Sequence, residues 1–240
     1  MNHASRFHKY LLLPMAVLLM FAVLGSDCKK QEPKSDGGFE TGSMTGNDGK
    51  VYKTVKIGNQ VWMAENLRET KYRNGDTIPE VTDDVEWGGL TTSARCVYDN
   101  SESNADIYGY LYNWFAVADG RNIAPSGWRV PTDADWTTLV NYLGGGYRAE
   151  GSKMKEAGTW HWTLPNREAT NESGFTALPG GYRANGNGYF NYLGNIAHFW
   201  SATEYNTNDA WDRVLYYDHS GVDRNYDNKR NGFSVRLIRD

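Results

Sequence analysis

The chain has 240 residues, of which 40% are hydrophobic, and a formal net charge of −4. The hydrophobic fraction is enough for a folded core, and the slight acidity excludes the basic stripe that is typical of nucleic-acid-binding proteins. Its 2 cysteines exclude both a disulfide-rich scaffold and a four-thiolate zinc site. The 9 Trp and 16 Tyr are an excess for so polar a chain, so aromatic rings either build the core or serve a binding surface.

The N-terminus combines a basic start with a short apolar run. Arg6 and Lys9 precede an apolar run over residues 10–24. A helix that spans a bilayer needs about 20 apolar residues, so this run is too short and is typical of a secretory signal. We therefore expect residues 1–27 to be a signal peptide and the protein to be exported.

Cys28 follows the apolar run at the position where a lipoprotein signal ends. The segment resembles a bacterial lipobox, in which the cysteine is acylated and becomes the new N-terminus. Asp27 departs from that motif, which has a small residue directly before the cysteine. If Cys28 is acylated, the protein is expected to be a membrane-anchored lipoprotein of the outer membrane or cell surface. Ordinary cleavage after Gly25 is the alternative.

Residues 28–48 are predicted to be a disordered tether that carries the lipid. Their only large apolar residues are Phe39 and Met44, which are too few to offset the entropy lost on ordering. An N-terminal pro-segment is the alternative. The negative net charge gives no attraction to an anionic membrane. The lipid membrane is therefore expected as a partner only through acylated Cys28.

Residues 49–240 are predicted to fold as one domain, since no second linker and no repeat of fixed period interrupts them. β-Branched and aromatic residues over 51–63 surround the pair Gly58-Asn59, a pattern that predicts a hairpin. Residues 233–239 alternate between apolar and polar side chains. This alternation predicts a closing strand that is half-buried against the core.

Two segments, 108–120 and 132–143, have apolar residues at helical spacing and are predicted to be helices. Thr132 is suited to cap the second helix, and a third, shorter helix is expected over 152–156. Short strands and loops rich in Gly, Asn and Asp make up the rest. The predicted fold class is therefore α+β.

Six sequence blocks resemble the Fibrobacter succinogenes major paralogous domain, a family found on bacterial exported proteins and lipoproteins. In chain order the blocks are GKVYKTVKIGNQVWMAENL, YGYLYNWFAV, APSGWRVPTDADWTTLVNYLGG, NESGFTALPGGYR, FWSATE and GFSVRLIRD. Together they span residues 49–240. The resemblance implies a C-type-lectin-like fold, related to that of formylglycine-generating enzymes. Such a fold has two main helices, a twisted and mostly antiparallel sheet, and long irregular loops.

The chain departs from this family at two positions that commonly hold cysteine. Ala124 and Leu237 stand there instead, so the disulfide that the resemblance implies is absent. The loss of such a cross-link typically costs about 2–4 kcal/mol of stability. Cys96 is then expected to be unpaired. A disulfide between Cys28 and Cys96 can form only if Cys28 is not acylated.

No catalytic motif is found in the predicted domain. His161, His198 and His219 are its only histidines, and none has a partner at the spacing of a metal motif. Two clusters of acids and amides offer oxygen ligands for calcium, with Asn208, Asp209 and Asp212 as the weak candidates, but neither cluster matches an EF-hand. We expect no catalytic residue, no metal and no cofactor. Calcium bound by these loops is the alternative to solvated loops.

The aromatic residues divide into core and loop groups. Five tryptophans lie at core-type spacings inside the sequence blocks: Trp62, Trp114, Trp128, Trp136 and Trp200. Others lie beside amides in polar or glycine-rich segments, where rings and amides together suit a sugar or a peptide. The predicted ligand-binding residues are Trp160, Trp162, Tyr182, Asn185, Asn187 and Tyr189. The alternative is that these rings pack over the loops.

These features predict a non-enzymatic, lipid-anchored binding module of the bacterial envelope. Its expected ligand is a glycan or an envelope protein, and nucleic acid is not expected as a partner. One alternative is a structural or assembly module of the envelope without a small ligand. A hydrolase that uses two loop carboxylates is a further alternative, because a glycosidase needs only a pair of them.

Overall fold

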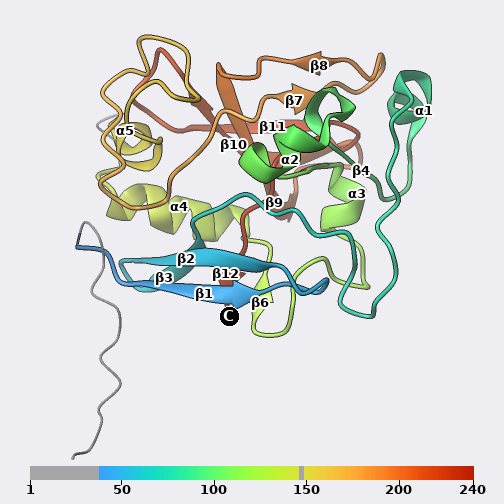
Figure 1. The fold of residues 1–240 in the computed structure, drawn as a ribbon, viewed down its shortest axis with the longest axis horizontal. Coiled ribbons are helices and arrows are strands. Elements are labelled where there is room, and N and C mark those ends of the chain that lie inside the picture. Colours follow the sequence, from blue (N-terminus) through green and yellow to red (C-terminus); the bar gives the residue numbers. More distant parts are fainter. Residues whose placement is uncertain (1–37, 146–148) are drawn as a thin grey trace, which may run out of the picture. The chain divides into compact units, whose positions relative to one another are not determined.

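Five short strands form an antiparallel sheet beside the C-terminus of the chain (Figure 1). The computed structural model describes residues 38–145 and 149–240. The sheet has the order β1-β2-β3-β12-β6, with strands β1 (Thr41–Thr45), β2 (Val51–Ile57), β3 (Gln60–Met63), β12 (Ile238–Arg239) and β6 (Trp128–Arg129). Because β12 lies between β3 and β6, both ends of the described chain meet in this sheet.

Strands β2 and β3 confirm the hairpin predicted over residues 51–63. Val55 pairs with Trp62, and Gly58 in the turn has a φ of 61°, which glycine adopts without strain. The predicted closing strand is shorter than expected, since only Ile238–Arg239 is a strand. The residues before it are buried on both sides rather than on one, because Arg236 is also buried and donates hydrogen bonds within the core.

Strand β1 falls within the segment that was expected to be a disordered tether, so that prediction is wrong for residues 41–45. All five residues pair with β2, from Thr41 opposite Val55 to Thr45 opposite Val51. Backbone pairing therefore provides the stabilisation that the polar side chains do not. The predicted signal peptide, residues 1–27, and Cys28 lie outside the described residues.

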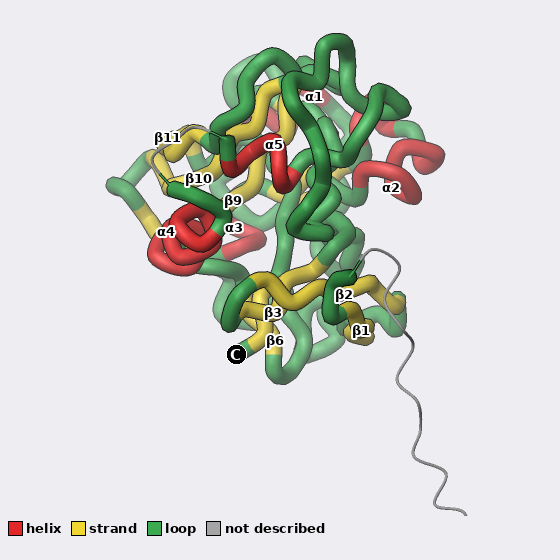
Figure 2. The backbone as a smooth tube through the Cα atoms, turned by 90° about the vertical axis from the view of Figure 1, so that its left-hand side faces the viewer, coloured by secondary structure: helices red, strands yellow, loops and turns green. Residues whose placement is uncertain are grey.

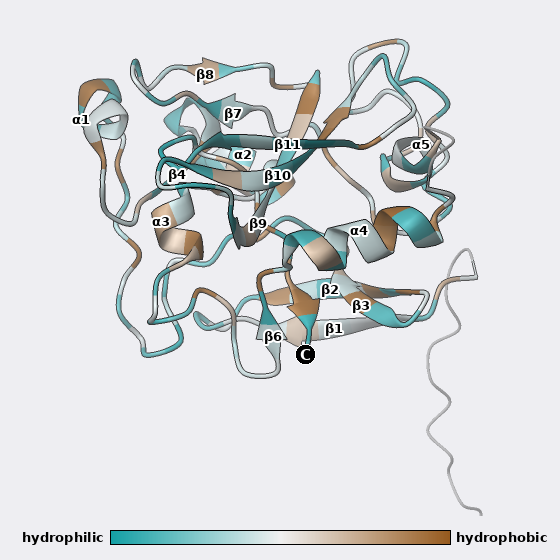
Figure 3. Ribbon diagram, turned by 180° about the vertical axis from the view of Figure 1, so that it is seen from behind, coloured by the Kyte–Doolittle hydropathy of each residue, from teal (hydrophilic) through white to brown (hydrophobic). Residues whose placement is uncertain are grey.

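Three longer strands form a second antiparallel sheet in the order β11-β10-β9. They are β9 (Ile196–Glu204), β10 (Asp209–Tyr216) and β11 (Asp223–Asn228). Strand β11 is hydrophilic along its length (Figure 3), which suits an edge strand in contact with water. Two further strand pairs are β4 (Arg95–Cys96) with β5 (Leu111–Tyr112) and β7 (Tyr182–Arg183) with β8 (Phe190–Asn191).

The described residues contain five α-helices and one 3₁₀-helix. These are α1 (Asp84–Gly89), the 3₁₀-helix Tyr98–Asn100, α2 (Glu102–Tyr108), α3 (Trp114–Val117), α4 (Asp133–Tyr142) and α5 (Glu150–Met154). Helix α4 lies between the two sheets (Figure 1). Helix α5 confirms a short helix close to the predicted range 152–156.

Helix α4 confirms the helix predicted over 132–143. Thr132 Oγ1 accepts a hydrogen bond from the Asp135 amide at 3.2 Å, and the Asp135 carboxylate accepts one from the Thr132 amide at 2.7 Å. This reciprocal capping box satisfies backbone groups that the first helical turn leaves unpaired. Trp136 and Leu139 form the buried face of the helix.

The single helix predicted over 108–120 is not found, because α2 ends at Tyr108 and β5 and the short α3 follow it. Asn113 separates them: its side chain accepts hydrogen bonds from the amides of Ala116, at 3.1 Å, and Ala94, at 3.0 Å. Residues 108–117 are nearly all buried, whereas Ala118 and Gly120 are exposed. The apolar residues of the segment therefore match a helical spacing without marking one face of a helix.

Aromatic side chains build much of the core. All five tryptophans predicted to be core residues are buried, and the rings of Trp62 and Trp136 lie 4.8 Å apart, joining α4 to the first sheet. Cys96 is buried as well and forms no disulfide among the described residues. The antiparallel sheets and short helices confirm the α+β class.

Loops form much of the backbone at the end opposite the five-stranded sheet (Figure 2). They surround the strand pair β7–β8 and the second sheet, and the candidate site is formed by strands of that sheet together with adjoining loops. Within residues 38–145 and 149–240, no helix has both the length and the apolar character needed to cross a bilayer.

Candidate functional site

Three neighbouring strands present titratable side chains on one face of the second sheet. Asp212 on β10 pairs with Asn225 on β11, and Val214, two residues further along β10, pairs with His198 on β9. Residues two apart on a strand share a face, so His198, Asp212 and Asp227 lie on the same side. One ligand atom from each lies within 4.8 Å of the other two. We refer to these three residues as the His–Asp cluster.

Asp212 is the most deeply buried member of the His–Asp cluster. Its Oδ2 lies 3.0 Å from Nδ1 of His198, within hydrogen-bond distance, and its side chain has no exposed surface. Its other oxygen, Oδ1, has no hydrogen-bond partner among the described residues. A buried carboxylate oxygen without a partner is costly. The cluster therefore lacks one donor or cation that would satisfy it.

Asp227 lies on the open side of the His–Asp cluster. Asn225 donates to Oδ2 of Asp227 at 3.0 Å, and Asn231 donates to Oδ1 at 3.4 Å. Burial, followed by the nearby Asp212 carboxylate, raises the pKa of Asp227 to about 6, although His198 acts in the opposite direction. Two carboxylates so close to each other disfavour a second negative charge.

A cleft of about 380 Å³ opens over the His–Asp cluster, and we refer to it as the tyrosine cleft. It is lined by Tyr182, Ala184, Asn185, Tyr192, Ile196, His198, Tyr216, Asn225, Asp227, Asn231 and Phe233. The ring of Tyr182 stacks with that of Tyr192 at 6.0 Å and meets His198 edge-on at 5.3 Å. His198 itself stacks on Phe233 at 4.2 Å. Aromatic rings thus form one wall, and amides and Asp227 supply polar groups.

Two of the six predicted ligand-binding residues line the tyrosine cleft. Tyr182 projects from β7, and Asn185 follows in the loop between β7 and β8. The backbone amide of Asn185 donates to Oδ1 of Asn231 at 2.8 Å, which ties this loop to the residue that also contacts Asp227. The loop is therefore held against the cluster side of the cleft.

The other four predicted residues lie elsewhere. Trp160, Asn187 and Tyr189 are exposed, with 91% of Trp160 and 59% of Tyr189 accessible, but none of them lines the tyrosine cleft. For Trp162 the prediction is wrong. Its ring is 1% exposed and its Nε1 donates to the carbonyl of Ala177 at 2.9 Å, so it packs in the core.

The three weak calcium candidates do not form one site. Asp209 and Asp212 are three residues apart on β10, so strand alternation places them on opposite faces of the sheet. The carboxylate of Asp209 accepts a hydrogen bond from Asn206 at 2.9 Å, and the amide of Asn208 donates to Oδ1 of Asn206 at 2.7 Å. Of the three, only Asp212 joins the His–Asp cluster.

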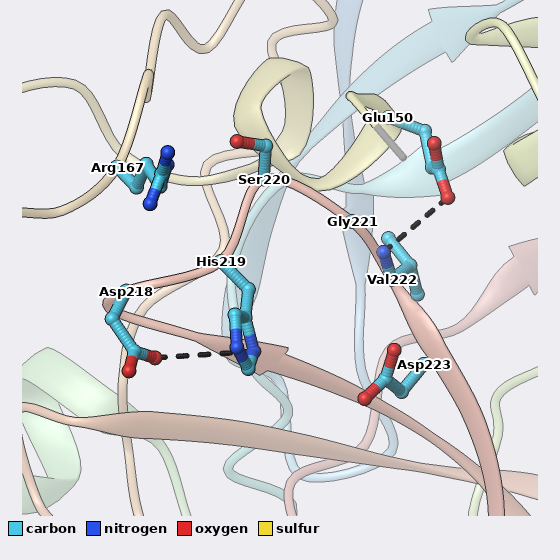
Figure 4. A pocket seen from close by; sticks show the side chains of 8 residues that line it. All are labelled: Glu150, Arg167, Asp218, His219, Ser220, Gly221, Val222 and Asp223. Carbon is cyan, nitrogen blue, oxygen red and sulfur yellow. Dashed lines mark hydrogen bonds and ion pairs between the residues drawn. The ribbon is translucent and has the colours of Figure 1, made fainter. Parts of the chain in front are cut away.

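A larger cavity of about 660 Å³ surrounds the loop between β10 and β11 (Figure 4). Its lining is Glu150, Arg167, Asp218, His219, Ser220, Gly221, Val222 and Asp223. A groove of about 400 Å³ adjoins both hollows, since it shares Tyr192 and Tyr216 with the tyrosine cleft and Asp218 and His219 with this cavity. Charged side chains of both signs make the cavity a polar extension of the cleft.

The sequence did not indicate the His–Asp cluster, because positions 198, 212 and 227 match no linear metal or catalytic motif. The signal that could have revealed the cluster is the alternation of side chains along each strand, combined with the register between neighbouring strands. Once β9, β10 and β11 are aligned, the three residues fall on one face. Chemically, the cluster can bind a cation or exchange a proton, and the tyrosine cleft can stack against a flat ligand.

The comparisons with known proteins identify a family. A model described as the Fibrobacter succinogenes major domain matches residues 55–239. This range includes the whole tyrosine cleft and the His–Asp cluster. No curated protein and no solved structure matches the chain.

Proposed function

We propose that this chain, which belongs to the Fibrobacter succinogenes major domain family, is a non-enzymatic binding module of the bacterial envelope that holds a glycan in the tyrosine cleft. An envelope protein is the alternative ligand. We also propose a C-type-lectin-like fold. That assignment is supported by the two ends of the described chain, which meet in one sheet, and by the loops gathered at the far end (Figure 1).

The observation that carries this proposal is the composition of the tyrosine cleft. Tyr182, Tyr192 and Tyr216 provide ring surface, while Asn185 and Asn225 provide amide groups beside it. Sugars present apolar faces edged with hydroxyl groups, which rings and amides can match together. The cleft, of about 380 Å³, is within the range of roughly 300–1,000 Å³ that small-molecule sites occupy.

The proposal is tested with a matched pair of tyrosine variants. Tyr192 and Tyr189 are similarly exposed, at 56% and 59%, and lie three residues apart, but only Tyr192 lines the tyrosine cleft. On a glycan array followed by calorimetry, Tyr192→Ala should weaken binding by about tenfold, the loss of roughly 1.4 kcal/mol. Tyr189→Ala should bind as the original chain does. Equal effects of the two substitutions, or no glycan bound by the original chain, would refute glycan binding in this cleft.

One observation favours the second candidate, an assembly module without a small ligand. Tyr205, Trp211 and Tyr226 form an aromatic patch on the opposite face of the second sheet, and Tyr205 and Tyr226 are 44% and 46% exposed. Arg224 lies 3.4 Å from the centroid of the Trp211 ring. Exposed rings together with arginine are enriched where proteins meet. A crosslinked partner in cells that is lost in Tyr226→Ala but kept in Tyr192→Ala would favour this function.

The hydrolase alternative is less well supported by the geometry. A retaining glycosidase needs two carboxylates that both reach the substrate. Asp227 lines the tyrosine cleft, whereas Asp212 has no exposed surface and cannot contact a ligand without rearrangement. Hydrolysis of a glycan that disappears in Asp227→Asn would nevertheless establish the enzyme and overturn our proposal.

We further propose that the protein is exported and anchored by acylation of Cys28, at the outer membrane or the cell surface. The support is the basic start, the short apolar run and the cysteine directly after it. In cell fractionation, Cys28→Ser should move the protein from the membrane to the soluble fraction. An unchanged distribution would contradict acylation without bearing on the tyrosine cleft.

A further inference from the structure

The His–Asp cluster has features of an incomplete metal site. Three side chains from three adjacent strands bring one ligand atom each to within 4.8 Å of the other two. Two of the residues, His198 and Asp227, also line the tyrosine cleft, so an ion from solvent can reach them. The third, Asp212, is fully buried and keeps one oxygen without a hydrogen-bond partner among the described residues.

We propose that His198, Asp212 and Asp227 bind one divalent transition-metal ion of the Zn²⁺ class at the base of the tyrosine cleft. A tetrahedral zinc ion lies about 2.0–2.2 Å from its nitrogen and oxygen ligands, so two of its ligand atoms are roughly 3.4 Å apart. The three ligand atoms of the cluster all lie within 4.8 Å of one another, so the widest separation exceeds the tetrahedral value by at most about 1.4 Å. Small side-chain rotations therefore close the site without movement of the strands.

The chemistry of the ligands selects the class of ion. Imidazole nitrogen suits zinc and related first-row ions, whereas calcium requires six to eight oxygens. The cluster offers one nitrogen and two carboxylates, a set of three protein ligands that leaves a position open for water or for a group of a bound ligand. His198 and Asp227 border the cleft, so that open position would face it.

The charges around the cluster also favour a cation. Arg213 follows Asp212 on β10 but points to the opposite face of the sheet and pairs with Asp133 at 2.8 Å. Among the described residues, neither carboxylate of the cluster forms an ion pair with a lysine or an arginine. A bound dication would neutralise both carboxylates and contact the unpaired oxygen of Asp212.

Calorimetry with ZnCl₂ on the metal-stripped full chain tests the site directly. We expect saturable binding of one ion per chain, at least tenfold weaker in Asp227→Asn and in His198→Gln. Asp209→Asn is the matched control, since it removes a carboxylate from the same strand as Asp212 but from the other face. It should bind zinc as the original chain does, and circular dichroism should show that each variant is folded.

A second measurement needs no variant. Co²⁺ added to the original chain should give the visible absorption bands of a low-coordinate site with a histidine ligand, and Zn²⁺ should displace them. The absence of saturable zinc binding, equal binding by the cluster variants and the original chain, or binding of Ca²⁺ alone would overturn the proposal. Because these readouts use metal only, they succeed or fail independently of any glycan.

Discussion

Glu69 makes the stability of the protein depend on pH in a direction opposite to that of most carboxylates. Its side chain is fully buried, where it accepts hydrogen bonds from the hydroxyl of Tyr52, at 2.9 Å, and from the amide of Asp48, at 3.0 Å. Burial, and then the nearby Asp48 carboxylate, raises the pKa of Glu69 from 4.5 to about 7. The folded protein therefore holds this proton more tightly than the unfolded chain does.

The sign and size of the effect follow from this difference. Below pH 4.5 the carboxyl is protonated in both states, and its full stabilising contribution is present. As the pH rises through about 7, the folded state must ionise a buried group and the contribution is lost. At about 1.4 kcal/mol per pKa unit, the loss amounts to roughly 3 kcal/mol. Glu69→Gln keeps a neutral side chain at every pH and should remove this dependence.

Urea unfolding of the original chain and of Glu69→Gln at pH 5 and pH 8 measures the effect. The free energy of unfolding of the variant, relative to that of the original chain, should rise by about 2–3 kcal/mol between these two pH values. Glu172→Gln changes an exposed glutamate and should show no such rise. If the difference between Glu69→Gln and the original chain is the same at both pH values, Glu69 is ionised throughout and the argument from burial fails.

Three other substitutions or modifications have definite outcomes. Thr132→Ala removes the capping box of α4 and should lower the free energy of unfolding by about 1 kcal/mol, with Thr132→Ser restoring most of it; an unchanged urea midpoint would contradict this. Gly46→Ala would place a methyl group 1.6 Å from Oε1 of Glu69. Overpacking of this kind should lower the free energy of unfolding by about 1–3 kcal/mol. A variant as stable as the original chain would show that the Glu69 carboxyl can move away. Burial raises the pKa of the Cys96 thiol to about 12, so the thiol is neutral and unreactive at pH 8. In the Cys28→Ser variant, iodoacetamide should therefore label Cys96 at pH 8 only after denaturation. Rapid labelling of the folded protein would show that this part of the core opens.

Local signals account for the elements that the sequence predicted well. Helix α4 has its cap, its first-turn acids and its buried face within one short segment, so periodicity and capping agree. Residues 108–120 have the same apolar spacing, but the side chain of Asn113 accepts a hydrogen bond from the amide of Ala94, which is distant in sequence. That contact fixes a strand and a short helix in place of one long helix. It depends on tertiary structure and leaves no periodic pattern.

The site was only partly predictable for a related reason. Tyr182 and Asn185 could be identified because rings beside amides in a glycine-rich segment already suggest a ligand surface. Trp162 has the same local composition and yet packs in the core, because its indole nitrogen finds a backbone carbonyl there. The His–Asp cluster depends on the register of three strands. Register is decided by the whole sheet and cannot be read from residue spacing.

The position of β1 determines how the protein would respond to force. If Cys28 is fixed in a membrane, any pull on the domain enters through β1, whose only neighbour in the sheet is β2. Contacts of Phe39 with the core and of Glu40, whose carbonyl accepts a hydrogen bond from the Lys56 amide at 2.9 Å, bear the load first. The strand pairs follow in order, from Thr41 with Val55 to Thr45 with Val51. Tension would thus peel off an edge strand one residue pair at a time and lengthen the anchor. The second sheet, which carries the tyrosine cleft, would stay intact while this happens.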